Sequence, residues 1–90
     1  MSRIIKAGII QMSNKIDTGA SVKEIRDAMI EAHVPYITEA GQNGVQMLCF
    51  QEIFTGPYFC PSQDVKWYDA AEAIPDGPTT RLMCEYSKKY

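Results

Sequence analysis

A chain of 90 residues can form at most one domain, because domains typically run from about 50 to 250 residues. With 46% hydrophobic and 22% charged residues, it has material for a core and does not have the composition of a disordered tail. The net charge is -2, and no cluster of Lys and Arg extends beyond Lys88 and Lys89, so we expect no nucleic-acid partner.

The apolar runs and the spacing of the cysteines further limit the class of protein to which this chain can belong. No run approaches the about 20 apolar residues that span a bilayer, so we expect no membrane partner. The three cysteines, Cys49, Cys60 and Cys84, form no CxxC pair and leave one odd thiol. They indicate neither a metal site nor a disulfide framework, and we expect a cytoplasmic protein.

The first predicted element is a strand over residues 3–12. This stretch is rich in β-branched residues and runs into polar, turn-forming residues at 13–19. Gly8 within it predicts the close approach of another element, because glycine otherwise weakens a strand.

A helix is expected to begin after Ser21, which stands three residues before Glu24 in the pattern of a capping box. Pro35 should kink this helix near residues 33–34 or split it in two, because proline removes a backbone donor. Gly41 and Gly44 should end it. One apolar stripe with helical spacing is predicted to face the core: Val22, Ile25, Met29, Ala32, Tyr36 and Ala40.

A second strand is predicted over residues 45–52. Its four consecutive apolar residues, 47–50, are typical of a strand that is covered on both faces. A strand, a helix and a strand in this order form a βαβ unit, so the two strands should be parallel.

The remaining chain predicts a long ordered loop and one more helix. The loop, over residues 55–78, carries four prolines and several aromatic residues, with a short helical piece at 69–73. The helix should begin between Pro78 and Thr80, with a proline in its first turn and a threonine cap, and run toward Tyr90. Two strands and two helices are a poor basis for an independent α/β domain.

Glu52 is the candidate catalytic residue. It ends the second strand and begins the aromatic loop, and open α/β folds place ligands beyond the carboxyl ends of their strands. A carboxylate beside apolar walls can serve as a general base. Position alone favours the simpler alternative, in which Glu52 ends the strand and faces water.

Three segments carry a family resemblance: KAGIIQM at 6–12, GVQMLCFQEIFTGPYFC at 44–60 and DGPTT at 76–80. In this order and spacing they resemble the start of a carbon-nitrogen hydrolase of the nitrilase superfamily, and the likeness covers essentially the whole chain. Most members carry Pro-Glu at the end of the second strand. Here Gln51 precedes Glu52, which favours the β-ureidopropionase branch over aliphatic nitrilases and simple amidases.

The resemblance implies a fold and a catalytic triad. The fold is an αββα four-layer sandwich that closes by forming a homodimer or higher homo-oligomer. The chain would supply its N-terminal βαβα segment, with residues 1–90 forming an incomplete part of one domain. The triad is Glu-Lys-Cys: Glu52 would be the general base, and the Lys and Cys would lie outside these 90 residues. No cofactor is implied.

The implied reaction is hydrolysis of the carbamoyl C-N bond of a small-molecule substrate, N-carbamoyl-β-alanine, to β-alanine, ammonia and CO2. The 90 residues alone should be inactive. Two alternatives stay open. One is an amidohydrolase for another N-carbamoyl amino acid or for N-carbamoylputrescine. The other is a fragment or interaction module without catalytic activity.

The other reactive or aromatic residues receive more modest interpretations. Phe54 and Tyr58, with Phe59, could form an apolar wall at the substrate site beside Glu52, although packing of the loop onto the sandwich is the favoured alternative. Structural roles are expected for most of the rest: Cys49 as a core thiol on the strand face opposite Glu52, Cys84 and His33 in packing, Lys66 as a solvated charge, and Trp67 and Tyr68 as anchors of an interface or of the loop. Cys60 could line the pocket.

Overall fold

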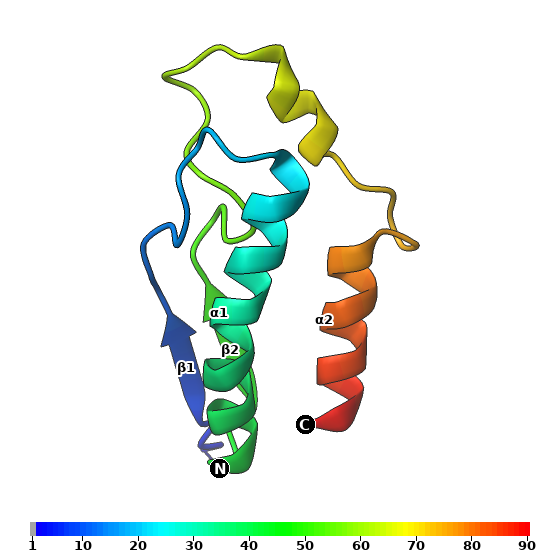
Figure 1. Cartoon of the computed structure of the whole chain (residues 1–90). Coiled ribbons are helices and arrows are strands. Elements are labelled where there is room, and N and C mark those ends of the chain that lie inside the picture. Colours follow the sequence, from blue (N-terminus) through cyan, green and yellow to red (C-terminus); the bar gives the residue numbers. More distant parts are fainter. Residues whose placement is uncertain (1) are drawn as a thin grey trace.

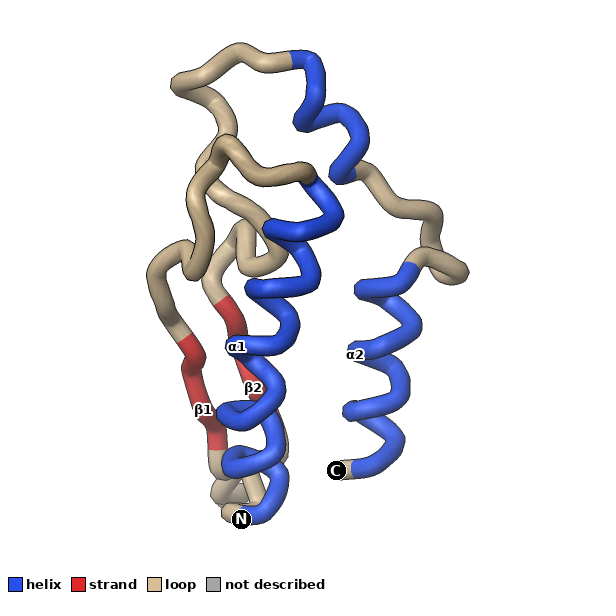
Figure 2. The backbone as a smooth tube through the Cα atoms, in the orientation of Figure 1, coloured by secondary structure: helices blue, strands red, loops and turns tan. Residues whose placement is uncertain are grey.

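The computed structural model describes residues 2–90. The elements follow in the order β1 (Ala7–Ile10), α1 (Val22–Gln42), β2 (Met47–Phe50), a 3-10 helix η1 (Val65–Ala70) and α2 (Pro78–Lys89). Figure 1 shows α1 lying over the two strands, with α2 running alongside α1 as a separate rod. Figure 2 shows that the long connection between β2 and α2 is mostly loop, interrupted by η1. The predicted βαβα order is confirmed.

The sheet has two parallel strands, as the βαβ pattern predicts. Ala7 pairs with Met47, and the register continues to Ile10 opposite Phe50. Both strands are shorter than the predicted ranges 3–12 and 45–52. Gly8 does meet a close neighbour: a Cβ built there would lie 3.3 Å from Leu48 Cδ1.

Two glutamine side chains bracket the short ladder. At its start, Gln46 Oε1 accepts a hydrogen bond of 3.1 Å from the backbone N–H of Lys6. At its end, Gln51 Oε1 accepts a bond of 2.7 Å from the backbone N–H of Met12. At the Gln46 end the backbone also connects the two segments, since the Gln46 N–H donates to the Lys6 carbonyl at 2.8 Å. Side-chain amides therefore add to the connection between the two chain segments at both ends of the ladder.

Helix α1 begins at the predicted cap, where Ser21 Oγ accepts from the Glu24 N–H at 3.1 Å. It passes through Pro35 as one element, so the predicted split does not occur. Pro35 and Glu31 are both exposed, and water can therefore bind the Glu31 carbonyl that the missing N–H leaves free. The helix ends at Gln42, followed by Gly44 in the left-handed conformation (φ +74°).

The buried stripe of α1 differs from the predicted one in its second half. Ile25, Met29, His33 and Ile37 are buried, at successive steps of four residues. Tyr36, predicted to lie on the buried stripe, is 55% exposed, which corrects that assignment. A period of 3.6 residues permits steps of three or four, and the side facing the strands decides between them.

Only one face of the sheet is covered, and this corrects two expectations. Gly8, Ile10, Leu48 and Phe50 lie on the more buried face, whereas Ala7, Ile9, Met47 and Cys49 are exposed. The prediction that β2 is covered on both faces is therefore wrong for these residues. The expected core thiol Cys49 is likewise exposed, because it points to the bare face.

The 3-10 helix η1 begins four residues before the predicted piece at 69–73 and overlaps it at residues 69–70. Its contacts correct the interpretation of Lys66. The Lys66 ammonium donates to the carbonyls of Thr18 at 2.6 Å and Ala20 at 3.4 Å, and it lies 4.6 Å from the ring centroid of Trp67. Lys66 is therefore a tether between η1 and the segment before α1, not a solvated charge.

Helix α2 begins with Pro78 at its first position, as predicted, but its cap differs. The cap residue is Gly77 and no threonine caps the helix; instead Glu72 accepts from the N–H and the hydroxyl of Thr79, both at 2.7 Å. A carboxylate here also complements the helix dipole. No residue of α2 is buried, and Cys84, expected to pack, is exposed.

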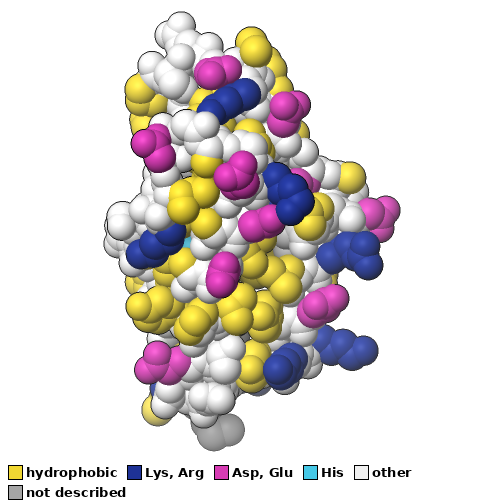
Figure 3. Space-filling view, viewed as in Figure 1, with side chains coloured by type: hydrophobic (Ala, Val, Ile, Leu, Met, Phe, Trp, Pro, Cys, Tyr) yellow, Lys and Arg dark blue, Asp and Glu magenta, His cyan; other side chains and the backbone are white. Residues whose placement is uncertain are grey.

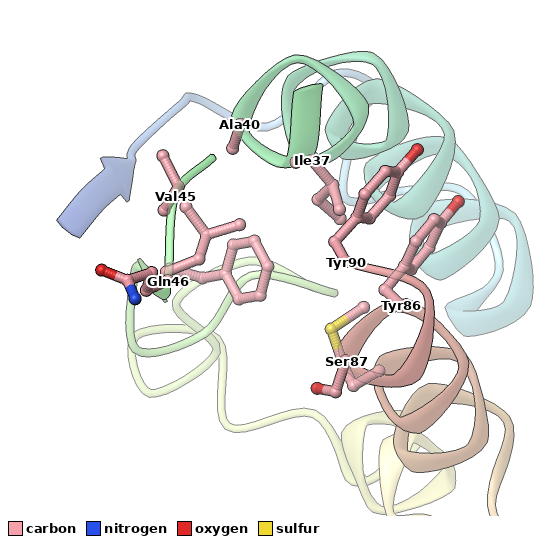
Figure 4. A pocket seen from close by; sticks show the side chains of 11 residues that line it. Ile37, Ala40, Val45, Gln46, Tyr86, Ser87 and Tyr90 are labelled. Atoms are coloured by element: carbon pink, nitrogen blue, oxygen red, sulfur yellow. The ribbon is translucent and has the colours of Figure 1, made fainter. Parts of the chain in front are cut away.

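A groove of about 530 Å³ separates α2 from α1 and β2. Figure 3 shows apolar side chains gathered over the lower half of this face, and Figure 4 shows Tyr86 and Tyr90 of the α2 end opposite Ile37 of α1, with Val45 across the groove. At its end the Tyr90 ring lies so close to Gly41 that a side chain at position 41 would displace the ring. This contact joins the C-terminal ends of the two helices.

Candidate active site

Glu52 lies two residues beyond the end of β2, at the carboxyl edge of the sheet. Its side chain is exposed and borders a hollow of about 420 Å³. One wall of the hollow is the segment that follows β1, residues 11–14, and the other is the segment that follows β2. Because parallel strands end at the same edge, the two segments meet there.

Gln51 fixes the distance between these two walls. Its bond to the Met12 N–H joins a residue of one wall to a residue of the other, and Gln51 is half-buried. A backbone N–H can bond only to an acceptor, so Oε1 must face Met12. The segment that carries Glu52 is thereby held against the end of β1.

Tyr58 lines the same hollow and lies near Glu52. Cys60, through hydrogen bonding and through the charge of its thiolate, raises the pKa of the Tyr58 phenol, with smaller contributions from burial and from the charge of Glu52. The raised pKa favours the protonated phenol, which can donate a hydrogen bond. It is 72% exposed and free to meet a ligand.

Phe54 lies away from the hollow, in the core. Its ring stacks on Phe50 with 4.8 Å between centroids and meets the edge of His33 at 5.3 Å. Phe54 therefore packs against other aromatic rings, as the packing alternative expected, and does not line the hollow. Glu52 and Tyr58 both line it. Phe59 and Cys60 border a different hollow of about 500 Å³, with Trp67 and Tyr68.

His33 occupies the structural position that was expected. It is 1% exposed, and its Nδ1 lies 2.6 Å from the Met29 carbonyl, which assigns the proton to Nδ1 because a carbonyl only accepts. Its Nε2 has no hydrogen-bond partner within residues 2–90 and lies among the rings of Phe50 and Phe54.

Sequence reasoning did not anticipate the wall formed by residues 11–14, nor the bond from Gln51. The available signal was indirect: parallel strands place both following segments at one edge. Over residues 2–90, no group of three or more His, Cys, Asp or Glu side chains is arranged to hold a metal ion. Over the same range, no helix is both long enough and apolar enough to span a bilayer.

Comparison with known proteins identifies the family. The family model for carbon-nitrogen hydrolases matches residues 6–90. A β-ureidopropionase of Arabidopsis thaliana is 33% identical over 98% of this chain, and a citrullinase of Francisella tularensis is 24% identical over 96%. The chain spans 21% and 27% of the length of these two relatives. No solved structure is significantly similar. On these matches, the chain belongs to the carbon-nitrogen hydrolase family.

Proposed function

We propose that this chain is the N-terminal part of an amidohydrolase that acts on ureido compounds, with N-carbamoyl-β-alanine as the preferred substrate. The observation that carries the proposal is the position of Glu52. It lies beside a hollow at the carboxyl edge of a parallel sheet, in a chain that belongs to the carbon-nitrogen hydrolase family.

The proposed role of Glu52 is that of general base. It takes the proton of a cysteine thiol, and the thiolate attacks the ureido carbonyl carbon to form a tetrahedral intermediate. A lysine stabilises the oxyanion of that intermediate. Collapse of the intermediate breaks a C–N bond, the departing nitrogen takes the proton that Glu52 accepted, and the acyl group remains on the cysteine sulfur. Glu52 then activates the water that releases this acyl group. Both the cysteine and the lysine are expected outside these 90 residues, and the net reaction consumes one water and yields β-alanine, ammonia and CO2.

The cysteines and lysines of this chain support placing those partners elsewhere. Cys49 points to the bare face of the sheet, and Cys60 borders the neighbouring hollow with Trp67. Lys66 is engaged with the carbonyls of Thr18 and Ala20. Within residues 2–90, Glu52 forms no ion pair.

The two relatives support the proposed substrate class. One is named for β-ureidopropionate and the other for citrulline, and both compounds carry a ureido group. Citrulline is therefore the second candidate substrate, and N-carbamoylputrescine or another N-carbamoyl amino acid is a further alternative. Tyr58, which is exposed and lines the hollow beside Glu52, is proposed as a substrate contact.

We also propose that residues 1–90 belong to a single αββα sandwich domain that assembles as a homodimer or higher oligomer. The bare apolar face of the sheet supports this, because Ile9 is 82% exposed and Met47 is 62% exposed, and such a face is ordinarily covered in a complete fold. The rival is a chain that serves as a binding module and performs no hydrolysis.

Replacing Glu52 by Gln in the complete protein tests the function. The amide keeps the size of the side chain but cannot accept the thiol proton. We expect kcat for N-carbamoyl-β-alanine to fall by about 100-fold or more, with an unchanged circular-dichroism spectrum. Wild-type turnover by this variant would overturn the role of Glu52. The kcat/KM values for N-carbamoyl-β-alanine, citrulline and N-carbamoylputrescine would rank the candidate substrates.

A further inference from the structure

Gln51 has a hydrogen-bonding capacity that its contact with Met12 does not use. The side-chain amide has one acceptor oxygen and an NH2 group with two donors. Oε1 is committed to the Met12 N–H at 2.7 Å, and this fixes the orientation of the whole amide. Within residues 2–90, Nε2 donates to no acceptor, although Gln51 is half-buried and lines the hollow beside Glu52.

An oriented donor of this kind is suited to a substrate oxygen. The amide cannot rotate without breaking the bond to Met12, so the NH2 group is the part of the amide that remains unpaired for a ligand in the hollow that Gln51 lines. Because the donor is already positioned, binding an acceptor oxygen costs little side-chain entropy. A ureido group carries one such oxygen, on the carbon that the proposed reaction attacks.

We propose that Gln51 is a substrate-binding residue whose Nε2 donates to the ureido carbonyl oxygen, while its Oε1 holds the two walls of the hollow together through Met12. This inference rests on the proposed function and adds to it a second residue beside Glu52. One side chain thus positions the site through one atom and binds the substrate through the other.

The chain provides a matched control in Gln46. Its Oε1 accepts from the Lys6 N–H in the same manner at the opposite end of the ladder, but Gln46 borders the groove beside α2 and not the hollow of Glu52. A substitution that preserves the acceptor and removes the donor can therefore be compared at two equivalent bonds, of which one faces the site.

Two variants of Gln51 separate positioning from binding. Gln51→Glu keeps an oxygen for the Met12 N–H and loses the NH2 donor, whereas Gln51→Met loses both. We expect both to lower kcat/KM for N-carbamoyl-β-alanine by about tenfold or more in the complete protein. Only Gln51→Met should also lower the unfolding midpoint. Because a second carboxylate perturbs Glu52, each variant is measured at its own pH optimum, and Gln51→Met checks the result without added charge.

Gln46→Glu should leave kcat/KM within about twofold of the wild type. Wild-type kcat/KM in Gln51→Glu would overturn the binding role, because it would show that only the bond to Met12 matters. A loss confined to substrates that carry a carboxylate would also overturn it, because the ureido oxygen is common to N-carbamoyl-β-alanine and N-carbamoylputrescine.

Failure of this inference can be told apart from failure of the proposed function. If Glu52→Gln abolishes turnover while both Gln51 variants remain fully active, the function holds and the donor role falls. If the wild-type protein neither hydrolyses nor binds N-carbamoyl-β-alanine, citrulline or N-carbamoylputrescine in calorimetric titration, both proposals fall together.

Discussion

The two helices α1 and α2 both carry apolar side chains, yet only α1 contributes buried residues to the core. Four residues of α1 are buried, whereas none of α2 is. Helix α1 is connected to β1 and β2 by the chain on either side, and their parallel pairing places both strands under one face of it. Helix α2 is the last element, so no strand follows it within residues 2–90. Its apolar side borders an open groove. An amphipathic helix thus gains most of its stability where another element packs against its apolar face, and here only α1 is packed in this way.

The largest test of this comparison uses one methionine from each helix. Met29 in α1 is 0% exposed, whereas Met83 in α2 is only half-buried on the groove. We expect Met29→Ala to lower the free energy of unfolding by about 2 to 5 kcal/mol, and Met83→Ala by about 1 kcal/mol or less. Urea unfolding followed by circular dichroism measures both. Equal losses would show that α2 belongs to the same core as α1.

A smaller effect is expected from the two helix caps. Glu72→Ala removes the group that binds the Thr79 N–H and hydroxyl, and Ser21→Ala removes the cap of α1. Each should cost about 1 kcal/mol. Hydrogen exchange should show faster exchange in the first turn of α2 for Glu72→Ala, and in the first turn of α1 for Ser21→Ala. Faster exchange in both helices after one substitution would contradict their independence.

The smallest effect concerns the loop between the two regions. Lys66→Met removes the bonds to Thr18 and Ala20, and we expect a loss of about 0.5 kcal/mol because Lys66 is only half-buried. Trp67, the only tryptophan of these 90 residues, should change its fluorescence because the cation over its ring is lost. In the control Lys88→Met, the fluorescence should stay unchanged. An unchanged spectrum in Lys66→Met would show that Lys66 does not hold the loop.

Short-range signals in the sequence were sufficient to predict where the two helices begin and where α1 ends. The Ser21 cap, the turn at Gly44 and the proline at the start of α2 are each decided by a few neighbouring atoms, and each is confirmed. The fate of Pro35 was not decided locally. It depends on whether the carbonyl that loses its donor faces water, and that depends on how the whole helix is oriented on the sheet.

Burial was the less predictable property, for a physical reason. Whether His33 or Tyr36 continues the stripe of α1, and whether Cys49 is covered, depends on which surfaces lie opposite them. The residues of the candidate site likewise fall into those that the local sequence predicts and those that depend on tertiary structure. Glu52 and Tyr58 could be placed near one another from their loop. The wall at 11–14 and the bond between Gln51 and Met12 arise instead from the strand register, which pairs residues 39 positions apart in the sequence.

The bare face of the sheet carries a free cysteine whose reactivity depends on whether the face is covered. Cys49 is exposed on the same face as Ile9, which pairs with it across the two strands. A thiol reagent should therefore modify Cys49 readily whenever this face is open to solvent, and slowly whenever a neighbouring layer lies on it. Peptide mapping by mass spectrometry distinguishes Cys49 from the other exposed thiols, Cys60 and Cys84. The alkylation rate of Cys49 thus measures directly whether another layer covers this face of the sheet.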